Sequence, residues 1–442
     1  MSVEGWTQRT LGSFTQFVKG ITYASKDYCK EDEGAIFLTI KCVSKAGGFK
    51  PEGIKYYRGL IHENEKLKEG DILISNTDLT RNGDIVGCPI MVPFLGLNEV
   101  TMSMDLSKLV IDPLQVDGGF LYYLLMTDKA RRFMQDHASG STVLHLQTKS
   151  VPNLELLIPK KVEEQTQIAA ILSTIDRAIE QTEAIIAKQQ RIKTGLMQDL
   201  LTKGIDEDGN VRSEETHEFK DSPLGRIPVD WDVQLLDKLA ERGSGHTPNK
   251  THQEYWNGGI KWVSLADSSK LDNIYIFDTD KEISEQGLKN SSAVLHPKGT
   301  VIVSRDAGVG KSAILSTQMA VSQHFIVWRC SRNLNNYYLY YWLQKDKPKF
   351  EGIALGSTIV TIGLQFFREY LIAIPNLLDE QILIAQIIKH SDECLCEHQH
   401  NLEKLKRQKT GLMQDLLTGN IRVTALLNDQ NKTLIHETVT LK

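Results

Sequence analysis

Cysteine, long hydrophobic runs and excess positive charge are all scarce in this sequence. The 442 residues contain no apolar run near the roughly 18–20 residues that a membrane-spanning helix needs. The first residues, from Met1 to Trp6, lack the basic-then-apolar pattern of a secretion signal. The six cysteines have no framework spacing, which favours reduced thiols over a disulfide scaffold or a metal site. We therefore expect a cytoplasmic protein with no membrane association and no bound metal.

The charge balance excludes a uniformly basic nucleic-acid-binding protein, because the net charge is −5. Residues 1–160 and 225–376 are each close to neutral, and residues 203–222 are rich in Asp and Glu. Any DNA binding therefore depends on local basic patches, or on partner subunits that supply much of the phosphate contact.

Signatures of catalysis are also missing. The sequence has no Asn/Asp-Pro-Pro-aromatic run for methyl transfer, no glycine-rich strand-to-helix loop for a cofactor, no Gly-x-Ser-x-Gly and no His-Glu-x-x-His. The run from Gly308 to Ser312 (GVGKS) resembles part of a phosphate-binding loop, but Arg305 stands where that motif needs its first glycine. We interpret this run as a turn that carries a basic residue. A nucleotide hydrolase built on Lys311 is kept as an alternative.

An internal repeat dominates what is present. The ten residues Lys193–Thr202 (KTGLMQDLLT) return unchanged at Lys409–Thr418, an offset of 409 − 193 = 216. At the same offset Glu164-Gln165 matches Glu380-Gln381, Asp176 matches Asp392, and Gly140-Ser141-Thr142 matches Gly356-Ser357-Thr358. Farther upstream the match is looser: Gly70–Ser75 resembles Gly299–Ser304, and Tyr122-Tyr123 resembles Tyr340-Tyr341. The chain therefore has two related halves with different loops.

Each half has the same expected order, a mixed domain of strands and short helices followed by one long helix. Short apolar runs bounded by turn residues predict strands at 35–40, 72–75, 154–158, 300–304, 324–329 and 370–374. Pro159 and Pro375 are expected to end the last strand of each domain, since proline removes a ladder donor.

Apolar residues at steps of three and four predict the long helices, from about Glu163 to Thr202 and again near the C-terminus. Forty helical residues reach roughly 60 Å. Neither helix is stable alone with an exposed apolar stripe, so we expect the two stripes to bury each other. Antiparallel packing would place the two domains at opposite ends, about a twofold axis that matches duplex DNA.

The predicted fold class is α+β: two tandem mixed α/β domains separated by two long helices that pack as an antiparallel coiled coil with pseudo-twofold symmetry. The expected boundaries are 1–160 for the first domain, 161–203 for the central helix, 204–224 for an acidic linker, 225–376 for the second domain, 377–423 for the C-terminal helix and 424–442 for a tail.

This layout and its motifs closely resemble the specificity subunits of type I restriction–modification systems. The motifs are the repeated KTGLMQDLLT, Pro223–Pro228 (PLGRIP) followed by Trp231, and Gly245–Pro248 (GHTP) followed by Tyr255-Trp256 and Ile260–Val263 (IKWV). The first half departs from the pattern, because Gly20–Tyr23 (GITY) lacks the Thr-Pro pair.

The resemblance implies two target-recognition domains that bind double-stranded DNA, and no catalytic site in this chain. It implies two copies of a methyltransferase subunit that uses S-adenosylmethionine to methylate adenine N6, and motor-nuclease restriction subunits that use ATP and Mg. These cofactors would be bound by the partners and none by this chain. The alternative of a different class is a coiled-coil scaffold whose repeated domains bind protein.

Loops that follow equivalent strands supply the candidate DNA contacts. Arginine can form bidentate hydrogen bonds with guanine, and asparagine can form them with adenine, while Gly-Ser-Thr loops suit phosphate. For each residue the alternative is a solvated turn or a cap. The candidates are Thr22, Lys41, Asn76, Thr77, Thr80, Arg81, Asn82, Ser141 and Thr142 in the first half, and His246, Thr247, Lys250, Arg305, Lys311, Ser357 and Thr358 in the second. Trp256 and Trp262 are expected either to stack near DNA or, more commonly for tryptophan, to be buried.

Overall fold

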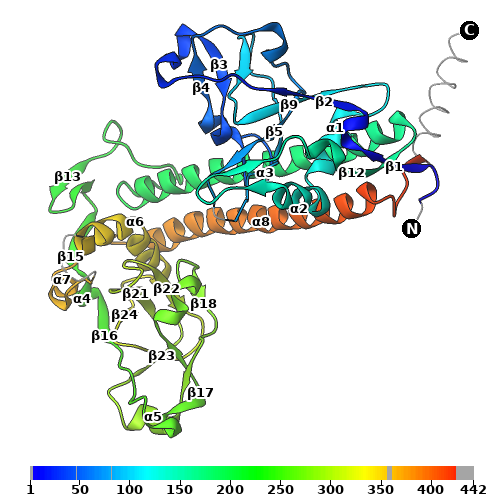
Figure 1. The fold of residues 1–442 in the computed structure, drawn as a ribbon. Helices are drawn as coiled ribbons and strands as arrows, with labels where there is room; N and C mark the ends of the chain where they lie inside the picture. The colour runs from blue at the N-terminus through cyan, green and yellow to red at the C-terminus, as the bar shows by residue number, and fades with distance from the viewer. Residues whose placement is uncertain (1–2, 46, 81, 356–360, 425–442) are drawn as a thin grey trace, which may run out of the picture. The chain divides into compact units, whose positions relative to one another are not determined.

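The chain divides by its contacts into two units (Figure 1). The computed structural model describes residues 3–45, 47–80, 82–355 and 361–424, without the side chains of Asp32 and Leu355. Unit 1 comprises residues 1–183 and 400–442, and unit 2 comprises residues 184–399. Each unit therefore holds one mixed domain, the first half of the long helix that follows this domain, and the last half of the other long helix.

Unit 1 is built from small sheets that cover a helical layer. The central sheet has the antiparallel order β2 (Thr15–Lys19), β9 (Leu106–Ile111), β5 (Ile72–Ser75), β7 (Pro89–Met91). The others are β4 (Lys55–Tyr57), β3 (Ala35–Leu38), β8 (Val100–Met102); β10 (Ala138–Ser139), β11 (Leu144–Leu146), β6 (Thr77–Asp78); and β1 (Trp6–Thr10) with β12 (Glu155–Pro159). The helices are α1 (Gly118–Leu125), α2 (Asp128–Asp136) and the start of α3 (Val162–Leu200).

Unit 2 repeats this plan with different loops. Its main sheet has the order β16 (Ala240–Ser244), β24 (Phe325–Cys330), β21 (Val301–Ser304), β22 (Ser312–Leu315), β18 (Tyr275–Ile276). The others are β19 (Glu282–Ile283), β17 (Trp256–Val263), β23 (Met319–Val321), β20 (Leu295–His296); β13 (Phe219–Ser222) with β14 (Gly225–Pro228); and β15 (Trp231–Leu235) with β25 (Leu371–Pro375). The helices are α4 (Leu236–Leu239), α5 (Glu285–Lys289), α6 (Asn336–Leu355), α7 (Leu364–Arg368) and the start of α8 (Leu378–Leu417).

Single-turn 3-10 helices connect the strands. In unit 1 they are η1 (Leu11–Ser13), η2 (Ser25–Asp27), η3 (Glu31–Glu33), η4 (Ile40–Cys42), η5 (Pro51–Gly53), η6 (Glu63–Glu65) and η7 (Val151–Asn153). In unit 2 they are η8 (Gln253–Tyr255) and the longer η9 (Leu265–Lys270).

The two units share their strand pairing residue for residue at key points. Trp6 lies opposite Pro159 in the β1–β12 pair, and Trp231 lies opposite Pro375 in the β15–β25 pair. β5 and β21 occupy equivalent central positions, and each is preceded by a glycine with positive φ: Gly70 at 85° and Gly299 at 87°. A side chain is disfavoured at that φ, which explains why both halves keep glycine there.

The long helices pair antiparallel inside each unit. In unit 1, Asp176 of α3 meets Lys409 of α8 at 2.6 Å and Glu183 meets Lys406 at 3.0 Å, so partner numbers fall along α8 as they rise along α3. In unit 2, Lys193 of α3 pairs with Asp392 of α8, and Leu200 shares a core cluster with Ile384 and Ile388. The predicted antiparallel coiled coil is thus confirmed.

A set of polar contacts repeats in both units and ties each domain to its helix. The buried Gln165 donates from its amide to Pro159 O (2.8 Å) and accepts from the Asp117 backbone N–H (2.9 Å). Gln381 does the same with Pro375 O (3.1 Å) and the Asn335 N–H (3.0 Å). These amides lie at the start of the long helices, where they fix the domain on the helix.

The repeated carboxylates make the matching ionic contacts. Tyr123 Oη donates to Asp176 (2.7 Å), which also pairs with Lys409, and Tyr341 Oη donates to Asp392 (2.9 Å), which also pairs with Lys193. The lysine at the head of each KTGLMQDLLT repeat thus clamps the long helix from the other half of the chain. This contact gives a physical reason for the lysine at the head of both repeats.

A second carboxylate in each unit holds the segment that follows the opposite long helix. Glu164 pairs with Arg422 (2.5 and 2.8 Å), and Glu380 pairs with Arg212 (2.6 and 3.2 Å). Gly419 lies against Trp6 in unit 1, as Gly204 lies against Trp231 in unit 2. The residues after α8 in unit 1 and the residues after α3 in unit 2 therefore occupy equivalent positions.

The expected strands all lie on observed ones: β3, β5, β12, β21, β24 and β25. Pro159 and Pro375 end β12 and β25 as predicted. The apolar stripe of α3 is only partly covered, because Ile168, Leu172 and Leu200 are buried whereas Ile185 and Ile192 are 42% and 41% exposed. None of the helices that the structure describes is long and apolar enough to cross a membrane. The domain boundaries predicted above stay predictions, and residues 425–442 of the predicted tail lie outside the described ranges.

Candidate nucleic-acid interface

Two predicted loops of unit 1 that lie far apart in the sequence are neighbours in the fold. Strand β6 pairs with β11, which sets Thr77 opposite His145 and Asp78 opposite Leu144. The Leu146 N–H donates to Asn76 O at 2.8 Å. Ser141 and Thr142 are exposed at the tip of the hairpin between β10 and β11. The Gly-Ser-Thr turn and the loop after β5 therefore form one surface.

The loop after β5 is held in a fixed shape by Asp78. Its carboxylate accepts from the backbone N–H groups of Thr80 (2.6 Å), Ile85 (2.5 Å) and Val86 (2.8 Å). Burial raises the pKa of Asp78, but these hydrogen bonds outweigh the burial and bring the pKa below its ordinary value. Thr80 Oγ1 in turn accepts from the Asp84 N–H (2.9 Å). A preorganised loop of this kind suits recognition, because little conformational entropy is lost on binding.

The structure separates the unit 1 candidates into exposed and internal ones. Asn76 is buried, donating to Met104 O (3.1 Å) and accepting from Ser107 Oγ (3.0 Å), so its amide is already used. Thr77 donates to Asp105 (3.1 Å). The exposed candidates are Thr22, Lys41, Asn82, Ser141 and Thr142, with Thr80 half-buried. Arg81 lies outside the described residues.

Lys41 lies at the edge of a cavity of about 620 Å³ in unit 1. Its walls include Tyr23, Tyr28 and the carboxylate residue Asp105. Thr77 contacts the same Asp105, which links this cavity to the loop after β5. Lys41 and the loop after β5 are thus connected through Asp105.

Unit 2 has the same loop pair with different chemistry. Arg305 follows β21 as Asn76 follows β5, and the Ile362 N–H donates to Arg305 O (2.9 Å) as the Leu146 N–H donates to Asn76 O. Arg305 Nε also donates to Ile362 O (3.0 Å). Ser357 and Thr358 lie outside the described residues. The framework is therefore shared, while an arginine replaces an asparagine at the loop's first position.

A chain of polar side chains runs beside Arg305. Thr247 Oγ1 donates to Gln323 Oε1 (2.5 Å), and Gln323 Nε2 lies 3.4 Å from His324 Nε2. His324 Nδ1 contacts Asp306, which also accepts from Thr361. The sequence prediction included Thr247 but missed Gln323, His324, Asp306 and Thr361. Only the tertiary fold brings these residues close to the turn after β21, and no spacing in the sequence indicates it.

Basic side chains flank this polar chain. Lys250 and Lys281 are exposed and line a cavity of about 370 Å³ together with Thr247, Gln323 and His324. His246 is exposed, and its carbonyl accepts from Trp262 Nε1 (3.0 Å). Trp262 is buried, which is the packing role rather than the stacking one, and Trp256 packs edge-on against it. Lys311 is half-buried and donates to Ser268 O (3.0 Å).

Comparison with known proteins identifies the family. The model of the type I restriction modification DNA specificity domain matches residues 3–189 and 228–407, which is more than half of the chain. The chain belongs to the type I DNA-specificity family. The type I restriction enzyme MjaVIII specificity subunit of Methanocaldococcus jannaschii is 24% identical over 439 residues, covering 96% of this chain and 94% of that protein. The MjaIX specificity subunit of the same organism is 32% identical over 181 residues, which are 40% of this chain and 41% of that protein.

A solved structure shows the same fold. The S subunit of a type I restriction-modification system from M. genitalium superposes with a TM-score of 0.61 at 16% identity, covering 94% of this chain and 96% of that chain. The α+β class with two tandem domains and two long helices, predicted from the repeat, is thus the fold of a type I specificity subunit.

The phosphate-loop alternative loses its structural context in this specificity subunit. The segment from Arg305 to Lys311 joins β21 to the antiparallel β22. A nucleotide-binding loop leads from a strand into a helix whose N–H groups hold the phosphates. Here Gly310 N–H donates back to Ser304 O (2.9 Å), which closes a hairpin turn. The interpretation of a turn with a basic residue is the one that the fold supports.

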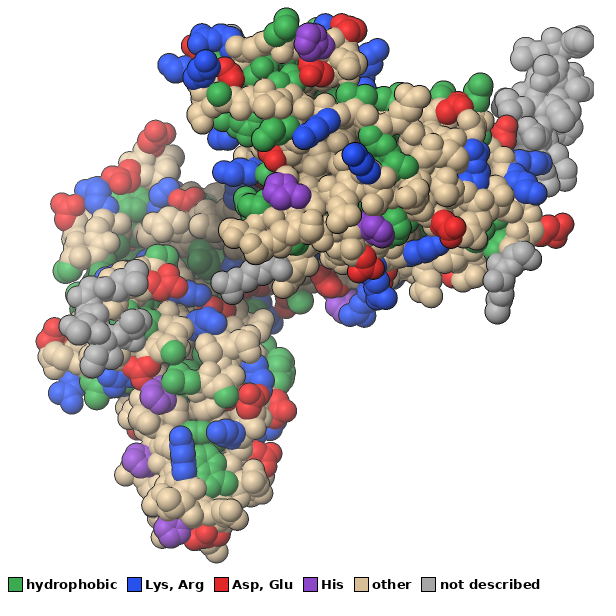
Figure 2. Space-filling view, viewed as in Figure 1, with side chains coloured by type: hydrophobic (Ala, Val, Ile, Leu, Met, Phe, Trp, Pro, Cys, Tyr) green, Lys and Arg blue, Asp and Glu red, His purple; other side chains and the backbone are tan. Residues whose placement is uncertain are grey.

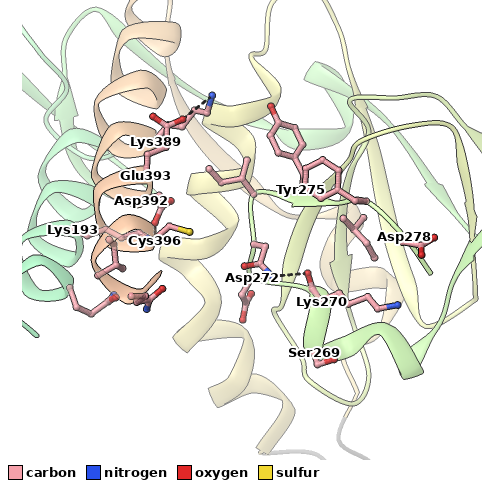
Figure 3. Close-up of a pocket in the computed structure, with 17 residues that line it drawn as sticks. Lys193, Ser269, Lys270, Asp272, Tyr275, Asp278, Lys389, Asp392, Glu393 and Cys396 are labelled. Atoms are coloured by element: carbon pink, nitrogen blue, oxygen red, sulfur yellow. Dashed lines mark hydrogen bonds and ion pairs between the residues drawn. The ribbon is translucent and has the colours of Figure 1, made fainter. Parts of the chain in front are cut away.

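A larger cavity of about 890 Å³ lies in unit 2 between the helices and the loop before β18 (Figure 3). Its walls carry both signs of charge, including Lys193 and Asp392, which pair across the helices, and Lys389 and Glu393, 3.4 Å apart on α8. None of the candidate DNA contacts that the structure describes lines this cavity. Among the described residues no group of three potential ligands is placed to hold a metal ion.

Charges are mixed over the surface in view, where Lys and Arg side chains alternate with Asp and Glu (Figure 2). This agrees with near-neutral domains in a chain of net charge −5. Positive charge is therefore concentrated only locally on the described surface, as where Lys250 and Lys281 line one cavity.

Proposed function

We propose that this chain reads a bipartite, asymmetric DNA site, with one half-site for each unit. The observation that carries the proposal is a shared framework with unlike loops. Gln165 and Gln381, or Asp176 and Asp392, make the same contacts in both units, whereas the turns after β5 and β21 carry different side chains. Equal frameworks present the loops in the same way, and unequal loops select different bases.

The exposed candidates divide into phosphate and base contacts. Hydroxyl and lysine side chains suit phosphate, which fixes register on the duplex. Arg305 and the amides suit base edges in the major groove. We assign the exposed Lys41, Ser141, Thr142 and Lys250 to phosphate. We assign the exposed Asn82 and the half-buried Arg305, with the residues around Thr247, to bases. Thr22, Thr80, His246 and Lys311 stay candidates without an assigned partner.

The long helices would set the unread gap and dock the methyltransferase subunits. Ile185 and Ile192 leave apolar surface exposed on α3, and Leu383 of α8 is 42% exposed. Exposed apolar residues on an otherwise paired helix favour a further partner. Two methyltransferase copies match the two units, and their S-adenosylmethionine, with the ATP and Mg of the restriction subunits, would lie outside this chain. The chain would contribute recognition and no chemistry of its own to adenine methylation and DNA cleavage.

Genome-wide mapping of methylated adenines tests this function. The full chain is co-expressed with the methyltransferase subunit of its operon in a host that lacks the system. The expected result is one new split motif, two unlike halves around a fixed gap. A complex that co-purifies but methylates nothing new would contradict the proposal. It would favour the alternative of a coiled-coil scaffold, for which sequence-specific DNA retention is absent.

A further inference from the structure

Gln323 has the environment of a base-reading side chain. It is exposed in the turn between β23 and β24, and it is held from both sides by other side chains of unit 2. We propose that Gln323 reads an adenine, in an A·T pair, within the half-site of unit 2, and that Thr247, His324 and Asp306 are positioning residues. This inference rests on the proposed function and adds to it the residue and the base.

The neighbours fix which way the amide faces. Asp306 contacts His324 Nδ1, and a carboxylate accepts only, so Nδ1 carries the proton. In the neutral ring Nε2 is then an acceptor, and the group it faces at 3.4 Å is the Nε2 amine of Gln323. On the other side Thr247 Oγ1 donates to Gln323 Oε1 (2.5 Å). Both ends of the amide are thereby assigned, because a flipped amide would turn its oxygen toward His324 Nε2, acceptor to acceptor.

What remains free on Gln323 is the pair of groups that adenine requires. Each amide oxygen has two acceptor positions and each amide nitrogen two N–H donors. One of each is used by Thr247 and His324, which leaves one acceptor and one donor on an exposed side chain. Adenine presents the acceptor N7 and the donor N6–H₂ in the major groove, the partner of a bidentate Gln or Asn.

The surroundings of Gln323 favour a polar ligand in the cavity beside it. Ser322 lines the same 370 Å³ cavity, is fully buried, and its hydroxyl has no hydrogen-bond partner among the described residues. Lys250 and Lys281 at the cavity are exposed and suit the phosphates on either side of a base pair. Arg305 joins the network through Asp306, 3.9 Å away, so the candidate turn after β21 and Gln323 belong to one surface.

The test compares variants of the full chain in the methyltransferase complex by mapping methylated adenines. Gln323→Ala should make one position of one half-site tolerant, raising methylation of sites without A·T there by about 10- to 100-fold. Gln323→Glu, which can only accept, should move the preference at that position toward the C·G pair, since cytosine N4 donates. His324→Phe should broaden the base preference at the same position and at no other. A residue with a merely structural role would not produce such a selective change.

The control is Gln318→Ala, an exposed glutamine in the loop between β22 and β23 of the same unit, for which the motif should stay unchanged. Methylation of the unaltered motif by both Gln323 variants would overturn the inference and leave the proposed function intact. A wild-type complex that methylates nothing would overturn both. If Gln323→Ala abolishes methylation, duplex binding decides: weakening confined to the A·T duplex supports the inference, and equal weakening with every base pair at that position overturns it.

Discussion

Segments distant in the sequence converge on the carboxylate of Glu380. It accepts from Arg212, from Trp231 Nε1 (3.3 Å) and from the Ile205 N–H (3.2 Å), and both charged side chains are about nine-tenths buried. Removing one partner of a buried ion pair leaves the other charge without compensation, which costs more than the pair contributes. Glu380 therefore ties the linker, through Arg212 and Ile205, to Trp231 of the second domain.

We expect Glu380→Leu to destabilise unit 2 by about 3 kcal/mol. Urea unfolding followed by tryptophan fluorescence would measure it, since Trp231 lies at the site. The matched control is Glu214→Leu, which removes an exposed ion pair with Arg226 and should cost less than about 0.5 kcal/mol. Equal effects of the two substitutions would contradict the role given to Glu380.

The burial of His296 leads to a prediction of how the stability of unit 2 changes at acid pH. Burial lowers the pKa of its imidazole, and the nearby Arg329 lowers it further. The unfolded chain therefore binds the proton first as the pH falls below about 6.5, and the folded state loses stability from there down to the lowered pKa. Above about pH 6.5 the His296 imidazole is neutral in both states and does not make the stability depend on pH. The Tm of His296→Gln should vary less between about pH 7.5 and 5.5 than the wild-type Tm, whereas exposed His246→Gln should follow the wild type.

Asn76 and Gln323 show which residues the sequence can assign. Both belong to turns that follow or precede a buried strand, and from spacing alone Asn76 is the better candidate because Ser75 marks the strand end. The fold reverses their exposure: Asn76 is 6% exposed and bonded within the domain, and Gln323 is exposed. A turn's position is predictable from local sequence, but which of its side chains turn outward depends on the strands packed behind it.

Among the elements, the strands and long helices follow from the sequence because their periodicity is local. The order of strands in the sheets does not, since pairs such as β1 with β12 join residues about 150 apart and no local pattern encodes them. The antiparallel pairing of α3 and α8 was predictable from the repeat. The incomplete burial at Ile185 and Ile192 was not, because one apolar stripe looks the same whether one partner or two cover it.

The exposed stripe of α3 gives a prediction for assembly. Replacing Ile185 and Ile192 together by Asp should weaken capture of the methyltransferase subunit at least tenfold, because charges cannot be buried unpaired in an apolar interface. Helix content by circular dichroism should change little, since both positions are about 40% exposed. Leu114→Asp, at an 87% exposed position in unit 1, is the control. Unchanged capture by the double variant would place the docking surface elsewhere.

Across the molecule, the framework contacts and the candidate DNA contacts involve different residues. The contacts of Gln165, Asp176 and Glu164 involve the helices and strand ends, and the candidate reading loops lie apart from them. Replacing residues 1–155 by the first domain of another specificity subunit should therefore change one half of the methylated motif and leave the other half and the gap. Methylome mapping reads the result, and a change in both halves would contradict separate reading by the two units.

The clamp between each KTGLMQDLLT repeat and the opposite helix has an evolutionary consequence. Recombination between the coding sequences of the two identical repeats would delete the 216 residues that separate them and leave a chain of 442 − 216 = 226 residues. Such a chain would keep one reading domain, Asp176, and Lys193 at the head of its single repeat, which is the equivalent of the clamping Lys409. Two copies would complete each other's clamps, so this single deletion would convert the asymmetric site proposed above into a palindromic one without a new contact having to evolve.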